Sequence, residues 1–136
     1  MIPQKEHFLS KISLQMKQAI VNGIVHTGDE ILNKAVVIIE NGIIISVQNE
    51  IPEAVNLIDL KGKHLSAGFI DIQINGGQKL YFSQYPTEET IQDIYETSLK
   101  FGTTHTLPCL ISSSNETILQ GIEAIRSYRT KHNNGV

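Results

Sequence analysis

The 136-residue chain is 40% hydrophobic and 18% charged, which is enough apolar material for one modest core and argues against a disordered chain. Its formal net charge is −3 at pH 7 and its Lys and Arg residues form no cluster, which argues against a nucleic-acid or anionic-membrane partner. No apolar run approaches the roughly 20 residues of a membrane-spanning helix, and the single cysteine, Cys109, cannot form an internal disulfide. We therefore expect a cytoplasmic protein with small-molecule or protein partners.

The first half of the chain predicts a small β-domain that follows an N-terminal extension. Residues 1–15 lack a clean periodicity, and Met16 directly precedes the first strand-like run. Strand-like runs then occur at 19–25, 35–39, 43–47, 57–60 and 63–65. The second and third runs are joined by Asn41 and Gly42, which tolerate the positive φ angles of a type I′ hairpin turn. A β-meander within residues 16–67 is expected.

The pattern changes at Gly68, where a strand with two different faces begins. Side chains alternate in polarity over residues 69–75, and the two-residue period of a strand then separates them onto opposite faces. The expected apolar face carries Ile70, Ile72 and Ile74, and the expected polar face carries Asp71, Gln73 and Asn75.

An amphipathic helix and another strand come next. Residues 88–100 predict the helix, with Thr87 as its N-cap and Gly102 as its end. Its expected buried stripe is Ile91, Ile94, Tyr95 and Leu99. Residues 103–111 predict the strand.

A second helix is indicated by the run from Ser113 to Glu116, which has the Ser-x-x-Glu form of a capping box. The expected buried stripe of this helix is Ile118, Ile122, Ile125 and Tyr128. Strand, helix, strand, helix in this order favours two β/α units of a parallel sheet over residues 68–136. The predicted fold class is therefore α/β, with a small β-domain first.

The segment Ser66-Ala67-Gly68-Phe69-Ile70-Asp71 is similar to the entry into the barrel of the amidohydrolase superfamily. The usual pattern there is Pro-Gly-Phe-Ile-Asp followed by His-x-His, whose two imidazoles lie on the same side of a strand and hold a divalent metal. Gln73 and Asn75 stand at those two positions. Neutral amides are much poorer ligands for a zinc-like ion, so this half of a two-metal site is expected to be empty.

Within the superfamily, the form Gln73-x-Asn75-Gly76 resembles the N-acetylglucosamine-6-phosphate deacetylases. A second match at residues 101–112 resembles that family's Gly-x-Thr-x-x-Leu-Pro-Thr-x-Ile-Thr strand, with Cys109 in place of the usual threonine. The β-domain also resembles that of the family. The resemblance covers residues 16–136.

This resemblance implies a TIM-like (β/α)8 barrel of which residues 68–136 form the first two β/α units, because a complete barrel needs about 250 residues. It implies hydrolysis of N-acetylglucosamine 6-phosphate to glucosamine 6-phosphate and acetate, with one zinc-like divalent metal ion activating water. The family's metal ligands and proton acceptor would lie beyond this segment, so the isolated chain is expected to hold no metal and to be inactive. The resemblance also implies a homodimer.

Four residues, Gln73, Asn75, Gly76 and Gly77, are the candidates for lining the substrate pocket. Gln73 and Asn75 could instead be ordinary solvent-facing residues of a strand. The two glycines could form an ordinary turn, or they could allow a close approach of the backbone to a ligand. Asp71 is interpreted as a structural hydrogen-bond acceptor because no partner for acid–base chemistry is visible near it.

The histidines and the cysteine are given no catalytic role. His105 is expected to be a core residue and Cys109 to be buried in an apolar strand. The remaining histidines are expected to be surface residues with no second ligand at metal spacing, namely His7, His26, His64 and His132.

Two other functions stay open at this point. The chain could be a non-catalytic remnant or binding module, because two barrel strands alone would expose an apolar parallel edge. It could also come from a related amidohydrolase that acts on a cyclic amide, although the missing His-x-His argues against this. A Gly-x-His-x-Glu-Gly-Pro-like stretch encoded just past residue 136 would favour the deacetylase.

Overall fold

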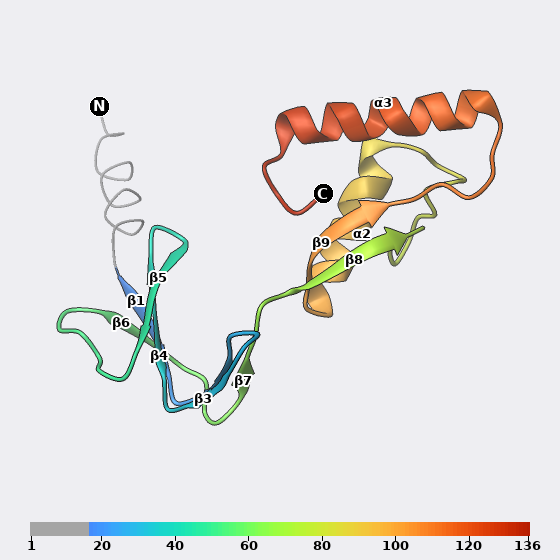
Figure 1. Ribbon diagram of the computed structural model, residues 1–136. Helices are drawn as coiled ribbons and strands as arrows, with labels where there is room; N and C mark the ends of the chain where they lie inside the picture. Colours follow the sequence, from blue (N-terminus) through green and yellow to red (C-terminus); the bar gives the residue numbers. More distant parts are fainter. Residues whose placement is uncertain (1–16) are drawn as a thin grey trace, which may run out of the picture. The chain divides into compact units, whose positions relative to one another are not determined.

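The computed structural model describes residues 17–136, and the chain divides into two compact units, Met1–Ala67 and Gly68–Val136 (Figure 1). The extension predicted at residues 1–15 lies outside the described residues. Within the described part, no helix has the length and apolar character needed to cross a membrane.

The first unit contains two small sheets. One has four strands in the order β5-β4-β1-β6, and the other has three in the order β3-β2-β7. The strands are β1 (Gln18–Val21), β2 (Ile24–His26), β3 (Ile31–Asn33), β4 (Val36–Glu40), β5 (Ile43–Gln48), β6 (Asn56–Asp59) and β7 (His64–Leu65). One apolar cluster, around Val21 and Ile38, belongs to the four-stranded sheet. A second cluster joins the two sheets, because it contains Val25 of β2 and Val37 of β4.

The single strand predicted at 19–25 is wrong, because the chain bends at Asn22 and Gly23. Asn22 has a φ of 57°, and β1 and β2 on either side of the bend belong to different sheets. A Cβ at Gly23 would lie 2.3 Å from Leu60 Cδ1 and 2.9 Å from the Lys63 carbonyl oxygen. Only glycine therefore fits this crossing.

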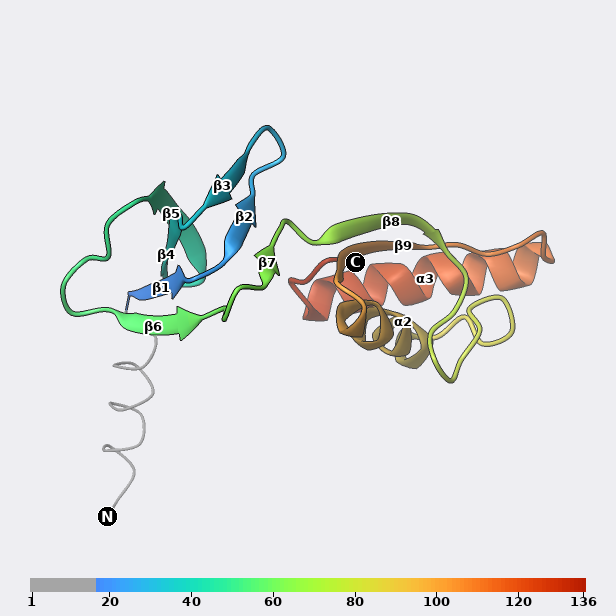
Figure 2. The same ribbon diagram turned by 90° about the horizontal axis from the view of Figure 1, so that it is seen from below.

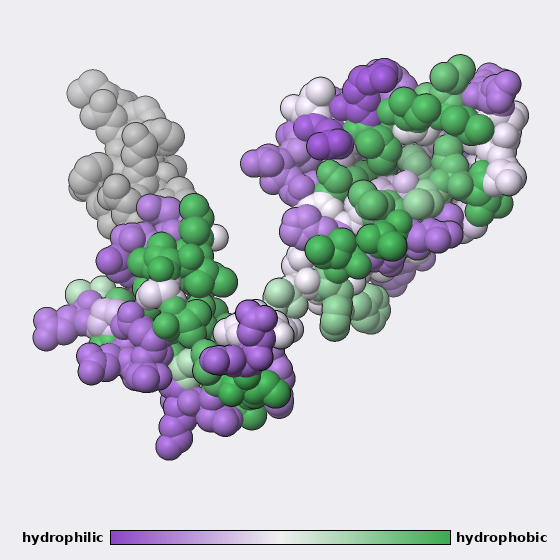
Figure 3. Space-filling view, viewed as in Figure 1, coloured by the Kyte–Doolittle hydropathy of each residue, from purple (hydrophilic) through white to green (hydrophobic). Residues whose placement is uncertain are grey.

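The predicted meander also needs correction. The hairpin at Asn41 and Gly42 is confirmed, with φ angles of 53° and 78°, and it pairs β4 with β5 in antiparallel fashion. However, β1 pairs with β6 and β2 pairs with β7 in parallel, so strands far apart in the sequence lie side by side. Strand β3 was not predicted. β5 leaves apolar side chains at the surface, visible over this strand in Figure 3.

The second unit is a β/α/β/α arrangement, as predicted. It consists of β8 (Phe69–Ile74), α2 (Glu88–Lys100), β9 (Thr103–Pro108) and α3 (Asn115–Lys131). The two strands are parallel, α2 packs against β9, and α3 packs against α2 (Figure 2). Their shared core is Phe82, Ile91, Ile94, Ala124 and Tyr128. The α/β class is therefore confirmed for this unit.

Helix α2 begins and ends where the sequence predicts. The side chain of Thr87 accepts a hydrogen bond from the backbone N–H of Thr90, which confirms the N-cap. Ile91 and Ile94 are fully buried, whereas Leu99, at the end of the predicted stripe, is exposed.

Helix α3 begins one residue later than the predicted capping box implies. Ser114, not Ser113, is the N-cap and accepts a hydrogen bond from the N–H of Thr117 at 3.2 Å. The buried side of α3 is Gly121, Ala124 and Tyr128, with Ile125 packed against the core. The predicted stripe is therefore confirmed at Ile125 and Tyr128 and wrong at Ile118 and Ile122, which are exposed. Small side chains at 121 and 124 let the helix approach its neighbours closely.

Candidate functional site

The candidate residues lie where β8 ends beside β9. Gln73 is exposed within β8, and Asn75 is half-buried directly after it. The Asn75 amide donates to the carbonyl of Cys109 at 2.9 Å, and the Cys109 N–H donates to the carbonyl of Ile74 at 2.8 Å. The carboxyl ends of the two parallel strands are thus tied together by the side chain of a candidate residue.

A β-bulge in β8 changes which residues share a face. Asp71 pairs with Thr106 and Ile74 pairs with Pro108, so three steps along β8 match two steps along β9. Thr106 and Pro108 are two residues apart and share a face, so Asp71 and Ile74 also share it.

The bulge therefore overturns the predicted face of three isoleucines. Ile74 packs against the core beneath the helices, whereas Ile70 and Ile72 are 68% and 72% exposed. Gln73, next to Ile74, lies on the opposite, open side of the sheet.

The two glycines form a short hairpin after β8. Gly76 makes a bridge with Tyr81, and the Gly77 N–H donates to the carbonyl of Leu80 at 3.0 Å. The N–H of Phe82 then donates to the Asn75 carbonyl at 2.7 Å, while the Phe82 side chain enters the core. A turn is present, and its shape holds the backbone of Asn75.

Asp93 of α2 fixes this hairpin, a role that no pattern in the sequence indicates. Its Oδ2 accepts hydrogen bonds from the N–H groups of Lys79 and Leu80 at 2.8 and 2.9 Å. A Cβ at Gly77 would lie 2.5 Å from the same oxygen and 2.6 Å from the Asp93 backbone. Glycine at 77 is thus required by the close contact between the hairpin and α2.

Further contacts from the same side of α2 secure the hairpin. The hydroxyl of Thr97 accepts a hydrogen bond from the Gln78 N–H at 3.0 Å. Lys100 donates from Nζ to Oε1 of Gln78 at 3.3 Å. Asp93, Thr97 and Lys100 are spaced four and three residues apart, which places them in one row on the helix.

Three other residues singled out in the sequence, Asp71, His105 and Cys109, also lie on or next to β8 and β9. Asp71 accepts a hydrogen bond from the Gln73 N–H at 3.0 Å, which confirms it as an acceptor. His105 is exposed rather than buried, because it stands on the open side of β9 opposite Ile70, and its Nδ1 lies 3.1 Å from Thr104 Oγ1. Cys109 is only half-buried and follows β9, which ends at Pro108 and not at 111.

The donor set here does not fit a metal ion. Among residues 17–136 there is no group of three or more His, Cys, Asp or Glu side chains that could hold one. Gln73 and Asn75 offer neutral amides, and the Asn75 nitrogen is already engaged by a carbonyl.

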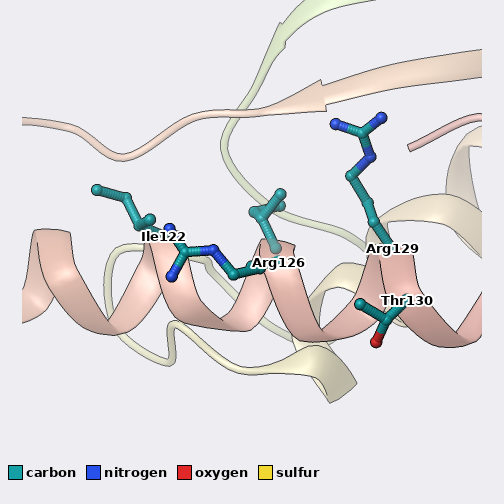
Figure 4. A pocket seen from close by; sticks show the side chains of 5 residues that line it. Ile122, Arg126, Arg129 and Thr130 are labelled. Carbon is teal, nitrogen blue, oxygen red and sulfur yellow. The ribbon is translucent and has the colours of Figure 1, made fainter.

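Charges elsewhere in this unit join the two helices. Glu88 at the start of α2 binds Nζ of Lys131 at 2.8 Å and accepts from the Ser127 hydroxyl at 2.7 Å. The Lys131 and Ser127 hydrogen bonds hold the pKa of Glu88 below its ordinary value. Figure 4 shows a hollow on α3 lined by Arg126 and Arg129, which contains none of the candidate residues.

Comparison with known proteins agrees with the resemblance seen in the sequence. Residues 18–65 match the model of the NagA composite domain. N-acetylglucosamine-6-phosphate deacetylase of Haemophilus influenzae is 38% identical over 121 residues, which is 88% of this chain and 32% of that protein. The crystal structure of N-acetylglucosamine-6-phosphate deacetylase from Pasteurella multocida superposes with a TM-score of 0.84 at 32% identity, over 89% of this chain and 32% of that one.

The predicted family resemblance is confirmed. It extends through both units, although the chain spans only about a third of the length of these deacetylases. N-acetylgalactosamine-6-phosphate deacetylase of a Shewanella species is also similar, with 41% identity over 61 residues, 45% of this chain and 16% of that protein. The Mycobacterium smegmatis deacetylase, with a TM-score of 0.61 at 22% identity, shares the fold.

Proposed function

We propose that this chain is part of an enzyme that hydrolyses N-acetylglucosamine 6-phosphate to glucosamine 6-phosphate and acetate. The observation that carries the proposal is the 38% identity to the Haemophilus influenzae deacetylase, which extends over 121 residues and therefore over both units. The match to the Pasteurella multocida structure supports it independently at the level of backbone geometry. A phosphorylated sugar substrate suits the predicted cytoplasmic location, and a homodimer stays part of the proposal.

In this proposal Gln73, Asn75, Gly76 and Gly77 line the substrate pocket. The support is their place at the carboxyl ends of two parallel strands, where ligands bind in β/α folds. We further propose that residues 68–136 begin a (β/α)8 barrel and that 16–67 form the small β-domain. The parallel β8–β9 pair and the division into compact units support these proposals.

The divalent metal that the resemblance implies would be held by residues outside this segment. The amides of Gln73 and Asn75 do not make a metal site, so the role proposed for them is contact with the substrate. Asn75 is held by Cys109, and the hairpin after it is held by Asp93, so this part of the pocket is rigid before substrate arrives.

The Shewanella relative supports a second candidate, N-acetylgalactosamine 6-phosphate, which differs from the first in its sugar. The similarity to that relative covers 45% of the chain, about half of what the Haemophilus influenzae protein matches. The glucosamine substrate is therefore the leading candidate.

The test is an acetate-release assay on the protein encoded by the complete reading frame that contains these residues. We expect turnover of N-acetylglucosamine 6-phosphate above that of the galactosamine isomer and of unphosphorylated N-acetylglucosamine. Absence of turnover for all three would contradict the proposal, and preference for the galactosamine isomer would replace the leading substrate.

Substitution of Gln73 tests the site itself. Gln73→Ala removes an exposed amide whose side chain makes no hydrogen bond to the described residues, so folding should be unaffected while kcat/KM falls by about tenfold or more. Gln120→Ala, also exposed but on α3, is the matched control and should leave the kinetics unchanged. Equal kinetics for both variants would remove Gln73 from the pocket.

A further inference from the structure

His26 and His64 meet on the surface of the first unit, although 38 residues separate them in the sequence. Nε2 of His26 lies 2.7 Å from Nδ1 of His64, and the ring centroids are 5.0 Å apart with a 29° angle between the planes. This contradicts the expectation that each is an isolated surface histidine.

The register of β2 and β7 explains why the two rings meet. Ile24 pairs with His64 in the parallel ladder, and residues two apart on a strand share a face. His26 and His64 therefore lie on the same face of the three-stranded sheet as diagonal neighbours. The backbone beneath them is fixed, because the Ile24 N–H donates to the carbonyl of Lys63 at 3.1 Å.

The two rings lie at or near the surface of the unit. His64 is exposed and His26 is half-buried, and the contact between them is a hydrogen bond in which one nitrogen donates its proton to the other. A cation that takes the place of the proton between the two nitrogens gains two imidazole ligands, and the paired strands β2 and β7 hold the backbone of both histidines in place.

We propose that His26 and His64 form a two-histidine site for a divalent transition-metal ion. Two nitrogens bound to one metal at right angles, at bond lengths of about 2.0–2.1 Å, lie about 2.9 Å apart. The observed 2.7 Å needs a small opening and a turn of the rings, and the shared proton moves to the other nitrogen of the ring that carries it, so that both histidines bind as neutral imidazoles.

The chemistry of the pair favours copper or nickel. Two cis imidazoles match the square-planar or tetragonal geometry of Cu²⁺ and Ni²⁺, and Cu²⁺ stands highest among first-row divalent ions in affinity. No third His, Cys, Asp or Glu ligand converges here within the described residues, so water completes the coordination. Mg²⁺ and Ca²⁺ prefer oxygen ligands and should not bind.

The test is titration of the purified 136-residue chain with Cu²⁺, followed by electron paramagnetic resonance. A His7→Gln background removes the histidine that lies outside the described residues. We expect one Cu²⁺ per chain with a spectrum showing two imidazole nitrogens. His26→Gln and His64→Gln should each weaken binding by about tenfold or more and leave one nitrogen, because the second ligand no longer binds intramolecularly.

His105→Gln is the matched control, since His105 is exposed and no other histidine of residues 17–136 contacts it. It should leave both the affinity and the spectrum unchanged, and circular dichroism should show that all variants are folded. Specific broadening of the His26 and His64 ring resonances by Cu²⁺ in the unsubstituted chain gives the same answer without a variant. A one-nitrogen spectrum, or binding unchanged by His26→Gln and His64→Gln, would overturn the site.

Discussion

At the scale of single residues, Asp93 does more than its place on a helix suggests. One oxygen of its carboxylate accepts hydrogen bonds from two backbone N–H groups, those of Lys79 and Leu80, in the hairpin after β8. Residue 77 must be glycine for the same reason, because a Cβ there would clash with Asp93. The hairpin beside the candidate residues therefore depends on a side chain 18 residues beyond Asn75.

Replacing this carboxylate should loosen the hairpin. In Asp93→Ala the N–H groups of Lys79 and Leu80 lose a charged acceptor, a hydrogen-bond type that contributes about 1.5–3 kcal/mol. We expect hydrogen exchange at these two amides to accelerate about tenfold or more, and trypsin to cleave faster after Lys79.

Glu96→Ala on the same helix is the control, because its carboxylate contacts Gln92 and not the hairpin. Unchanged exchange at both amides in Asp93→Ala would show that the hairpin is held without Asp93, by its own backbone hydrogen bonds and the contacts of Thr97 and Lys100.

At the scale of elements, the two helices are joined by Glu88 and Lys131, and this link makes their packing depend on pH. Folding lowers the pKa of Glu88 from its ordinary value of 4.5, with Lys131 as the largest cause. Its contribution to stability is complete above that value and is lost as the pH falls through the lowered pKa.

Glu88→Gln should therefore lower the melting temperature at pH 7, and the difference from the unsubstituted chain should shrink at pH values well below 4.5. Glu116→Gln, which alters an exposed acidic residue in the first turn of α3, is the control. Thermal unfolding across the pH range measures both. A difference that stays constant with pH would mean that the Glu88 charge has no part in it.

The sequence predicts elements well where local chemistry decides them. Thr87 caps α2, and Asn41 with Gly42 turns the hairpin, because both effects act within four residues. The bend at Asn22 and Gly23 carries the same Asn-Gly signal and was overlooked. What local chemistry could not predict is that the strands on either side enter different sheets, which depends on contacts of Gly23 with Leu60 and Lys63.

The faces of β8, beside the candidate residues, were mispredicted because they too depend on distant contacts. Alternation placed three isoleucines together, but the bulge between Asp71 and Ile74 exists only through pairing with β9. Asp93 and the contact of His26 with His64 likewise depend on elements that meet after folding. Gln73 and Asn75 are candidates because a family motif, not periodicity, singles them out.

At the scale of the whole molecule, each unit leaves apolar side chains in contact with water. In the second unit these include Phe69, Ile70, Ile72 and Leu107 on and around the β8–β9 pair, each more than half exposed. Contiguous apolar surface of this kind binds hydrophobic dyes.

We expect the folded chain to enhance the fluorescence of anilinonaphthalene sulfonate, and the double variant Ile70→Thr with Ile72→Thr to reduce it without loss of cooperative unfolding. Leu119→Gln, which removes an equally exposed side chain from α3, should have a smaller effect. A chain that does not enhance the dye would show that this surface is covered in solution.

The parallel pairs of the first unit have a consequence for the order of folding. β4 and β5 join through a two-residue turn, whereas β1 with β6 and β2 with β7 must wait until distant segments meet, at the entropic cost of closing long loops. The β8–α2–β9 unit closes a shorter loop with a helix inside it. During synthesis on the ribosome, β1 could pair only with β4, and β2 only with β3, until residues 56–65 emerge. One edge of each strand would stay open until then, and the β4–β5 hairpin would form first as the template on which the four-stranded sheet is completed.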